Sequence, residues 1–358
     1  KTNFFNKYYL CYNLRVFKYL GIYMVYNKLV IFFNLFFLVS CSSISINKQI
    51  KQEILITDEE IKNQNEFLIS SLAIASRKLH DIAWPIMAFN IDSCPNSRIN
   101  AFGIMVSHIK NLPLSLHSSF HAANPTNLEG NNSFKFPMII SVADKSPANR
   151  AKIIEGDQII SINDHIVNYK NYKTLLDEAA IRGVLEIKVK RENKEFLFNL
   201  KSEVICGYPV QTMISPIPNA YADGSKIYIT IATFDFVKDN QEIAFLIGHE
   251  LAHNIYHYKG DPLYESNGNP IPIEEKPSLQ KITDLLIFQT EAKETEADLY
   301  GVEFATKAGI PQNKVANYFR RLSIYMPQLM KDSFFRMHPG NARRVLDIEA
   351  KLKALQND

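Results

Sequence analysis

The segment His249-Glu250-Leu251-Ala252-His253 has the pattern H-E-x-x-H within a stretch of helical periodicity. On a helix, residues i and i+4 lie on the same face, roughly 6 Å apart along the axis, so both imidazoles can bind one zinc ion. Glu250 lies beside these ligands, where it can act as general base on the attacking water, whose pKa zinc lowers to about 7. The segment therefore predicts hydrolysis of peptide bonds, with Glu250 as a catalytic residue.

The residues around this segment favour a helix. Asp239, with Glu242 three residues later, has the spacing of a capping box. An apolar stripe at helical spacing follows, formed by Ile243, Leu246, Ile247, Leu251 and Ile255. The alternative is an ordinary amphipathic helix with two surface histidines, so the zinc hypothesis requires a further ligand elsewhere in the chain.

A tetrahedral catalytic zinc site has three protein ligands and one open position. The metzincin arrangement does not supply the third ligand, because Tyr256 and Lys259 stand where that pattern requires a glycine and a histidine. A later His, Glu or Asp must therefore complete the site.

A second helical stretch, further along the chain, carries carboxylates at helical spacing. It is predicted to end at Lys307, because Gly309 suits the C′ position and Pro311 cannot continue a helix. Glu294 and Asp298 are at positions i and i+4 of this stretch. One carboxylate can therefore reach the metal while the other accepts a hydrogen bond from a liganding imidazole.

Together these motifs resemble the envelope-associated gluzincins of the BepA and HtpX type, which pair HExxH with a later E-x-x-x-D. The resemblance implies that Glu294 is the third ligand of one zinc ion per chain and that Asp298 supports a ligand. Glu296 and Glu291 are the alternatives for the third ligand.

The resemblance extends to the residues that precede the H-E-x-x-H segment. An Asn- and Ala-rich turn, residues 219–224, is followed by a strand over residues 226–230. This strand is similar to the edge strand on which the family holds its substrate. The resemblance implies that Asn219 and Tyr228 contribute to substrate binding.

A further similar element lies near the end of the chain, where His338-Pro339 is followed by Arg344 six residues after the histidine. The resemblance implies that Arg344 supports the site and that His338 lies near the metal. There His338 either contacts the transition-state oxyanion or occupies the open position in a latent state. The alternative is a structural role for His338 at the start of a helix.

One position departs from the family pattern. Many members have a histidine nine residues after the first zinc histidine, whereas Tyr258 stands there and His257 precedes it. His257 is four residues after His253, but a straight helix does not bring three successive turns to one ion. His257 is therefore not expected to bind the metal.

The beginning of the chain predicts a secretory signal. The first 40 residues contain five Lys or Arg and no acidic residue, and residues 29–40 form an apolar run that is short for a membrane span. Residues 38–41 resemble a bacterial lipoprotein box, which implies lipidation of Cys41, and Met24 is the natural start within the signal region 1–40. The alternative is a transmembrane anchor over residues 9–40.

The charge balance excludes nucleic acid as a partner. Without residues 1–40 the chain has 35 basic and 37 acidic side chains, a formal charge of −2. A lipid on Cys41 would anchor an otherwise soluble enzyme to a membrane. We therefore expect the periplasmic face of a bacterial cell envelope, and Ser42 after the cysteine favours the outer membrane.

Two cysteines outside the signal region, Cys94 and Cys206, enclose a segment of different character. In an oxidising compartment they are candidates for a disulfide that closes a long loop. The alternative is a pair of buried free thiols.

The enclosed segment has short alternating strands and turns. It resembles the PDZ domains of bacterial envelope proteases at Ser146-Pro147-Ala148, at Gly156-Asp157-Gln158-Ile159 and at Ile162-Asn163-Asp164, where Asp164 replaces the usual glycine. PDZ domains bind extended peptides at a sheet edge and take the terminal carboxylate in a turn. Residues 101–104 are the candidate for that turn, and the alternative is a rigid spacer without a working groove.

The predicted fold class is α+β. A mainly helical zincin metalloprotease domain with a small edge sheet is expected from residues 48–93 and 204–358, and a β-rich PDZ-like domain is inserted at residues 96–203. In the first segment a helix is predicted over Thr57–Ile82, with a capping box at its start and an end at Trp84-Pro85.

The functional hypothesis is a zinc endopeptidase that hydrolyses envelope proteins in quality control. Its polypeptide substrates are expected to be presented by the PDZ-like domain, through their C-termini. The alternative is a chaperone or assembly factor with a latent zinc site that His338 caps.

Overall fold

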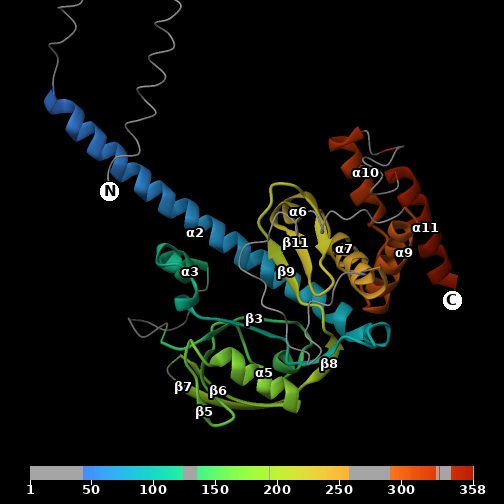
Figure 1. The fold of residues 1–358 in the computed structure, drawn as a ribbon, viewed down its shortest axis with the longest axis horizontal. Helices are drawn as coiled ribbons and strands as arrows, with labels where there is room; N and C mark the ends of the chain where they lie inside the picture. The colour runs from blue at the N-terminus through green and yellow to red at the C-terminus, as the bar shows by residue number, and fades with distance from the viewer. Residues whose placement is uncertain are drawn as a thin grey trace, which may run out of the picture. The chain divides into compact units, whose positions relative to one another are not determined.

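The fold is of the α+β class, and the described part of the chain has helices and three separate sheets (Figure 1). In this computed structural model the described residues are 43–123, 135–192, 194–257, 291–327, 330 and 340–357. The predicted signal region with Met24 and Cys41 lies outside the described residues, as does His338. Across the described residues, no helix is both long enough and apolar enough to cross a membrane.

The chain divides into two units, Lys1–Ile61 and Lys62–Asp358. The described part of the first unit is the beginning of helix α2 (Ser43–Phe89), and the other described elements belong to the second unit. The second unit contains two hydrophobic clusters. One draws on residues 79–94, on Ala143 and on residues 205–348, and the other draws on residues 102–200.

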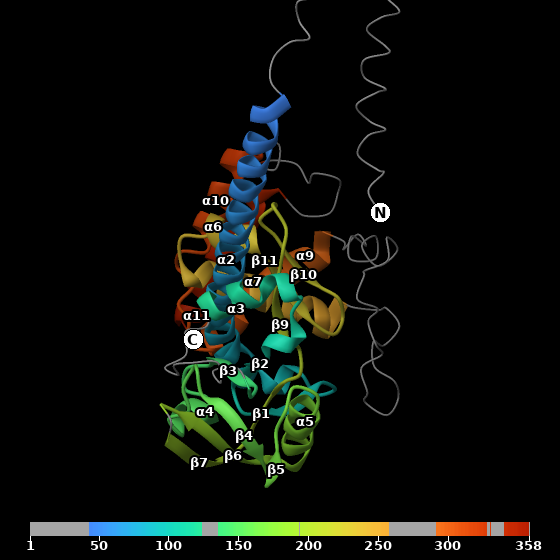
Figure 2. The same ribbon diagram turned by 90° about the vertical axis from the view of Figure 1, so that its left-hand side faces the viewer.

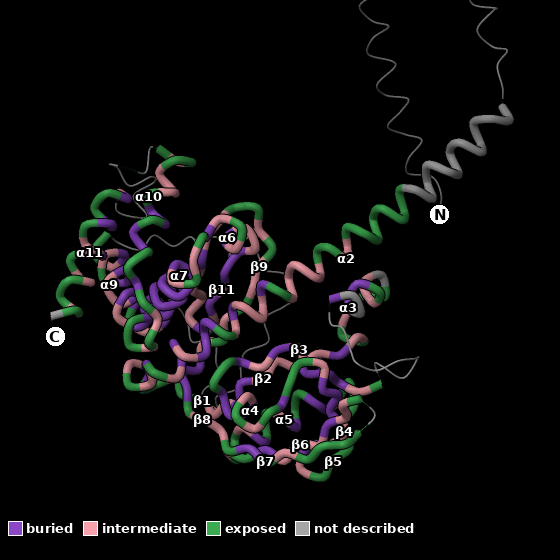
Figure 3. The backbone as a smooth tube through the Cα atoms, turned by 180° about the vertical axis from the view of Figure 1, so that it is seen from behind, coloured by how far each residue is buried: buried purple, intermediate pink, exposed green. Residues whose placement is uncertain are grey.

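Helix α7 (Asn240–Ala252) lies at the centre of the first cluster. Every residue from Glu242 to Ala252 is buried, as the purple tube of Figure 3 shows. This helix is therefore enclosed on all sides and is not amphipathic. Helix α9 (Glu291–Lys307) packs along it, and α11 (Asn341–Asn357) packs against both α9 and α10 (Ala316–Tyr325).

The ends of α7 and α9 follow local signals in the sequence. The Asp239 carboxylate accepts a hydrogen bond from the backbone N–H of Gln241 at 3.0 Å, which caps α7. Glu242 accepts from the N–H of Lys238, one residue before the position that a capping box requires. At the end of α9, Gly309 has a φ of +76°, the left-handed conformation expected for a C′ glycine.

A small sheet covers one side of α7. It has the order β10-β11-β9, in which β11 is antiparallel to β10 and parallel to β9. Its strands are β9 (Val210–Met213), β10 (Ala220–Ala222) and β11 (Ile227–Thr230).

The strand predicted at the edge, residues 226–230, is the central strand of this sheet, and that prediction is wrong. Its backbone groups pair with β10 on one side and β9 on the other, so they are not available to a peptide. The edge position was inferred from the resemblance, and the residues of one strand do not reveal which strands lie beside it. Among the described strands, β10 is the edge that lies beside α7.

Helix α2 also differs from its prediction, because it continues through Trp84 and Pro85 to Phe89 and has Thr57 in its interior. A proline inside a helix costs about 3 kcal/mol. Trp84, Ile86 and Met87 are buried in the first cluster, and each such side chain contributes about 1.5–3 kcal/mol. Tertiary packing therefore outweighs the local signal for a helix end.

The second cluster belongs to a six-stranded sheet that α5 (Tyr172–Arg182) packs against (Figure 2). The main path of this sheet has the order β2-β3-β4-β6-β7, with β2 at one edge and β5 paired to β4. The strands are β2 (Ile104–Ser107), β3 (Met138–Val142), β4 (Gln158–Ile162), β5 (His165–Ile166), β6 (Val184–Arg191) and β7 (Lys194–Lys201).

Two turns of this domain have the backbone that the sequence suggested. Asn163 and Asp164 have φ values of 46° and 63°, so the tight turn forms without the usual glycine. Gly103 has a φ of +75°, and a Cβ on it would lie 2.1 Å from the Cβ of Ser146. Only glycine fits at this position, directly before β2.

The domain is attached to the rest of the unit by a two-stranded ribbon. Strand β1 (Arg98–Ala101) pairs with β8 (Glu203–Cys206), and Cys206 forms a disulfide with Cys94. The two cysteines are 112 residues apart and buried. In the chain-entropy model, closing a loop of this length contributes about 5 kcal/mol to stability.

Candidate metal centre

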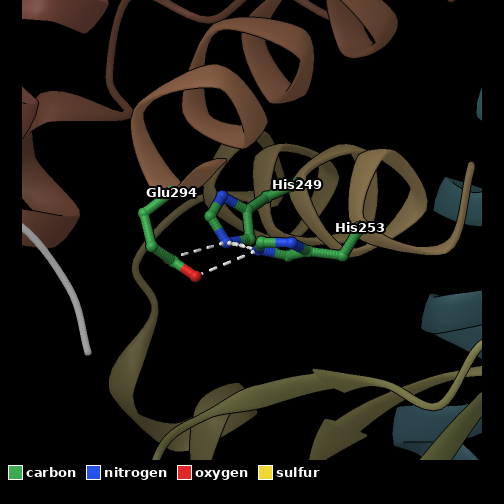
Figure 4. A group of neighbouring side chains, drawn as sticks. All are labelled: His249, His253 and Glu294. Atoms are coloured by element: carbon green, nitrogen blue, oxygen red, sulfur yellow. Dashed lines mark hydrogen bonds and ion pairs between the residues drawn. The ribbon is translucent and has the colours of Figure 1, made fainter. Parts of the chain in front are cut away.

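Three buried side chains from two helices point toward one another (Figure 4). His249 comes from the last turn of α7, His253 follows this helix directly as the first residue of the π-helical turn His253–His257, and Glu294 comes from the first turn of α9. The Nε2 atoms of the two histidines are 3.0 Å apart. The Glu294 carboxylate lies 3.5 Å from Nε2 of His249 and 3.3 Å from Nε2 of His253.

These distances fit a single metal ion. Donors that lie about 2.0–2.2 Å from a tetrahedral zinc ion are roughly 3.3–3.6 Å from one another. The two distances to the Glu294 carboxylate fall in this range, and the 3.0 Å between the imidazole nitrogens is slightly shorter. The three donor atoms belong to two imidazoles and one carboxylate, which is a known ligand set of catalytic zinc. The geometry therefore leaves room for one ion at the point where the three side chains meet.

The electrostatics of the site also favour a cation. Burial alone would lower the pKa of His249, but hydrogen bonds and charges from Asp298 and Glu294 outweigh burial and raise that pKa to about 10. Glu250, Glu294 and Asp298 are buried carboxylates, and they lie near one buried guanidinium, that of Arg344. With His249 neutral, as a metal ligand must be, the formal charges of these four groups sum to −2, which one divalent cation neutralises.

The second nitrogen of His249 is held by a buried ion pair. Nδ1 of His249 lies 2.9 Å from Oδ1 of Asp298. Arg344 from α11 donates two hydrogen bonds to Asp298, at 2.7 and 2.5 Å, and its guanidinium lies 4.3 Å from the ring centroid of Phe319. Burial would raise the pKa of Asp298, but the charges and hydrogen bonds of Arg344 and His249 hold it below its usual value. The pair therefore keeps a carboxylate ready to orient the imidazole.

A contact between two glycines sets the separation of α7 and α9. A Cβ on Gly248 would lie 2.8 Å from the backbone oxygen of Gly301, and a Cβ on Gly301 would lie 3.1 Å from the backbone nitrogen of His249. Any larger residue would force the backbones apart. Gly248 directly precedes the ligand His249, and Gly301 follows the ligand Glu294 by seven residues. Nothing in the sequence pattern indicated that the two glycines face each other.

Asn254 links the metal helix to the small sheet. Its side chain accepts a hydrogen bond from the N–H of Gly224 at 2.7 Å and donates one to the carbonyl of Lys226 at 3.0 Å. It is buried and follows His253 directly. The turn between β10 and β11 is thereby fixed relative to the ligands, a role that the sequence did not indicate.

The residues predicted for substrate binding have structural contacts. The backbone N–H of Asn219 lies 2.9 Å from the hydroxyls of Thr230 and of Thr233, so it anchors the start of β10. The Tyr228 hydroxyl donates to Asp223 at 3.0 Å, and burial together with that carboxylate raises the pKa of Tyr228. Tyr228 lies in the central strand β11, and its hydrogen bond to Asp223 stabilises the turn between β10 and β11.

The alternatives for the third ligand lie elsewhere. Glu291 is exposed, and Glu296 points to His257, with which it forms an ion-pair contact of 2.9 Å. His257 does not join the three donors but contacts Nδ1 of His253. Glu250 is buried beside His249. Burial is the main cause that raises the pKa of Tyr318 to about 12, and the charge of Glu250 raises it further.

Residues 189–262 match the model of Peptidase family M48. The matched range contains the H-E-x-x-H segment and the strands β9 to β11, and it ends before Glu294. This match supports a metallopeptidase, as the motif predicted. The comparison with curated protein sequences found no match.

A solved structure of the HtrA3 PDZ domain bound to a phage-derived ligand (FGRWV) is similar to part of this chain. The sequence identity is 27% and the TM-score is 0.24, and the similarity covers 31% of this chain and 92% of that chain. The PDZ-like character of the inserted domain therefore rests on its own residues and turns.

Replacing Gly248 by Ala tests the glycine contact. The added methyl group must separate α7 from α9, which we expect to cost about 1–3 kcal/mol of unfolding free energy. It should also weaken zinc binding by about tenfold or more, on the scale of lost ligand support. Chemical denaturation and chelator competition measure the two effects.

Gly309→Ala is the matched control, because nothing lies within 4 Å of the position of its Cβ. The positive φ makes this change cost about 1–2 kcal/mol as well, but away from the site. Equal zinc affinity in the two variants would show that the glycine contact does not position the ligands.

Proposed function

We propose that this chain is a zinc-dependent endopeptidase that acts on proteins of a bacterial cell envelope. The observation that carries the proposal is the convergence of His249, His253 and Glu294 on one point, with Glu250 buried next to them. The match to Peptidase family M48 supports the same class of reaction.

The side chains of the site have separate roles in this reaction. His249, His253 and Glu294 would hold zinc, which supplies Lewis acidity that activates water and polarises the scissile carbonyl. Glu250 takes the proton of the attacking water and transfers it to the leaving amine. Asp298 and Arg344 keep His249 in the tautomer that presents Nε2 to the metal.

Strand β10 is the proposed site of substrate pairing. Within the described residues it pairs only with β11, so its other edge can accept an extended peptide by strand addition. It also lies beside α7, which carries the reacting groups. The hydrogen bonds of Asn254 to the following turn hold this edge at a constant distance from the ligands.

The inserted domain is proposed to bind the C-termini of substrates. Its edge strand β2 follows the turn at Gly103, and the N–H groups of such a turn can bind a terminal carboxylate. Substrates held there would be delivered to the peptidase, which suits a role in protein quality control.

Exchanging Glu250 for Gln should retain zinc and lower kcat by about 100- to 10,000-fold, because the amide cannot take the proton. Glu294→Gln is the companion variant, because it alters a proposed ligand. Loss of a group that only supports a ligand weakens metal binding about 10- to 100-fold, and we expect a larger loss of zinc affinity here. Metal analysis and casein hydrolysis separate the two effects. Undiminished casein hydrolysis by Glu250→Gln would overturn the mechanism.

Peptide binding tests the inserted domain. An extended apolar peptide with a free C-terminus should bind more tightly than the same peptide with an amidated C-terminus, because only the first has a carboxylate. Fluorescence anisotropy with the whole chain measures both. Equal affinities, or no binding of either peptide, would contradict the role in C-terminus recognition.

Incorporation of a labelled fatty acid tests the proposed lipid anchor. Expressed in a bacterium with two membranes, the chain should take up the label, whereas a Cys41→Ser variant should take up none because it cannot be acylated. An unlabelled wild-type chain recovered with membranes would favour the transmembrane alternative.

A further inference from the structure

The second ring nitrogen of His253 begins a row of polar contacts that leads away from the metal site. Nδ1 of His253 lies 3.0 Å from Nδ1 of His257. Nε2 of His257 lies 2.9 Å from Oε2 of Glu296 on α9. The His257 side chain is 3% exposed and that of Glu296 is 53% exposed, so the row ends at the surface.

Metal binding allows one arrangement of protons along this row. Nε2 of His253 must offer its lone pair to the metal, so its proton is on Nδ1 and is donated to His257. Nδ1 of His257 then acts as the acceptor, and the remaining proton is on Nε2. That N–H donates to the carboxylate of Glu296.

The local backbone brings the two histidines together. His253–His257 forms a π-helical turn that begins at the ligand itself, and the two ring centroids are 5.1 Å apart. Such turns are rare and often occur at functional sites. A buried imidazole without partners would be unfavourable, and here both of its nitrogens have one.

The two imidazole ligands thus have different support. His249 contacts Asp298, a buried carboxylate that is paired with Arg344. His253 contacts a neutral ring, and the charge that orients this ring is partly exposed. Because His257 lies between His253 and the charge of Glu296, loss of His257 removes both the contact at Nδ1 of His253 and its link to that charge.

We propose that His257 is a positioning residue that holds the tautomer and the ring orientation of His253 for metal binding, and that Glu296 in turn orients His257. The inference rests on the proposed zinc site. It assigns no contact with substrate to either residue.

Zinc dissociation constants, measured by competition with a chelator, test this proposal. His257→Phe keeps a ring but removes both nitrogens, and we expect about 10- to 100-fold weaker binding. His257→Asn places an oxygen where Nδ1 was, so it can accept from His253 and should recover most of the affinity. Glu296→Ala should cause a smaller loss than His257→Phe, because the imidazole remains.

The control is Glu303→Gln. Glu303 is on the same helix as Glu296, and the change removes its surface ion pair of 2.7 Å with Lys351 of α11. Its zinc affinity should equal that of the wild type. The absorption bands of the Co²⁺-substituted protein give a second readout, because they report the ligand geometry independently of catalysis. They should shift in His257→Phe and not in the control.

The outcomes separate this inference from the proposed function. If the wild-type chain does not bind one zinc ion, the proposed function fails and the inference fails with it. If the wild type binds zinc and His257→Phe binds it equally well, with unchanged Co²⁺ bands, only the positioning role is overturned. If His257→Phe does not fold, Glu296→Ala decides, because a zinc affinity equal to that of the wild type, with no shift of the Co²⁺ bands, contradicts the proposed orientation of His257 by Glu296 and overturns the inference as stated.

Discussion

The close approach of α7 and α9 at Gly248 and Gly301 is the constraint on which the site depends. With no side chain between them, the two backbones come near enough for a carboxylate at the start of α9 to reach imidazoles on α7. The same approach allows Asp298 to reach His249 from the other side. A separation larger by one methyl group would loosen both contacts, because each extends over a short side chain.

Buried charge explains the rest of the centre. Three carboxylates enclosed with one guanidinium would destabilise the fold unless further positive charge were present. The charge of Arg344 balances that of Asp298. The charge of Glu294 is balanced only by a bound cation, and Glu250 is neutralised when it takes a proton from water. The elements that bring these groups together are therefore arranged for a metal ion, and their stability is expected to depend on it.

Each imidazole ligand has a support of its own. On His249 it is a buried ion pair supplied by two other helices, whereas on His253 it is a neighbouring histidine within one π-helical turn. Asn254, which lies between His253 and His257 in the sequence, bonds the same π-helical turn to the small sheet. Ligand support and the anchor of the turn between β10 and β11 thus meet within five consecutive residues, and a distortion of that turn would affect both.

The sequence by itself determined what local spacing can encode: the two imidazoles one turn apart, Glu250 between them, the start of α7 and the end of α9. Glu294 could be chosen only by resemblance, and which strand lies at the edge of the small sheet was predicted wrongly. The opposed glycines, the continuation of α2 through Pro85 and the link from His257 to Glu296 were decided by tertiary structure. They depend on which surfaces of distant segments touch, and the periodicity of one segment contains no information about the segment packed against it.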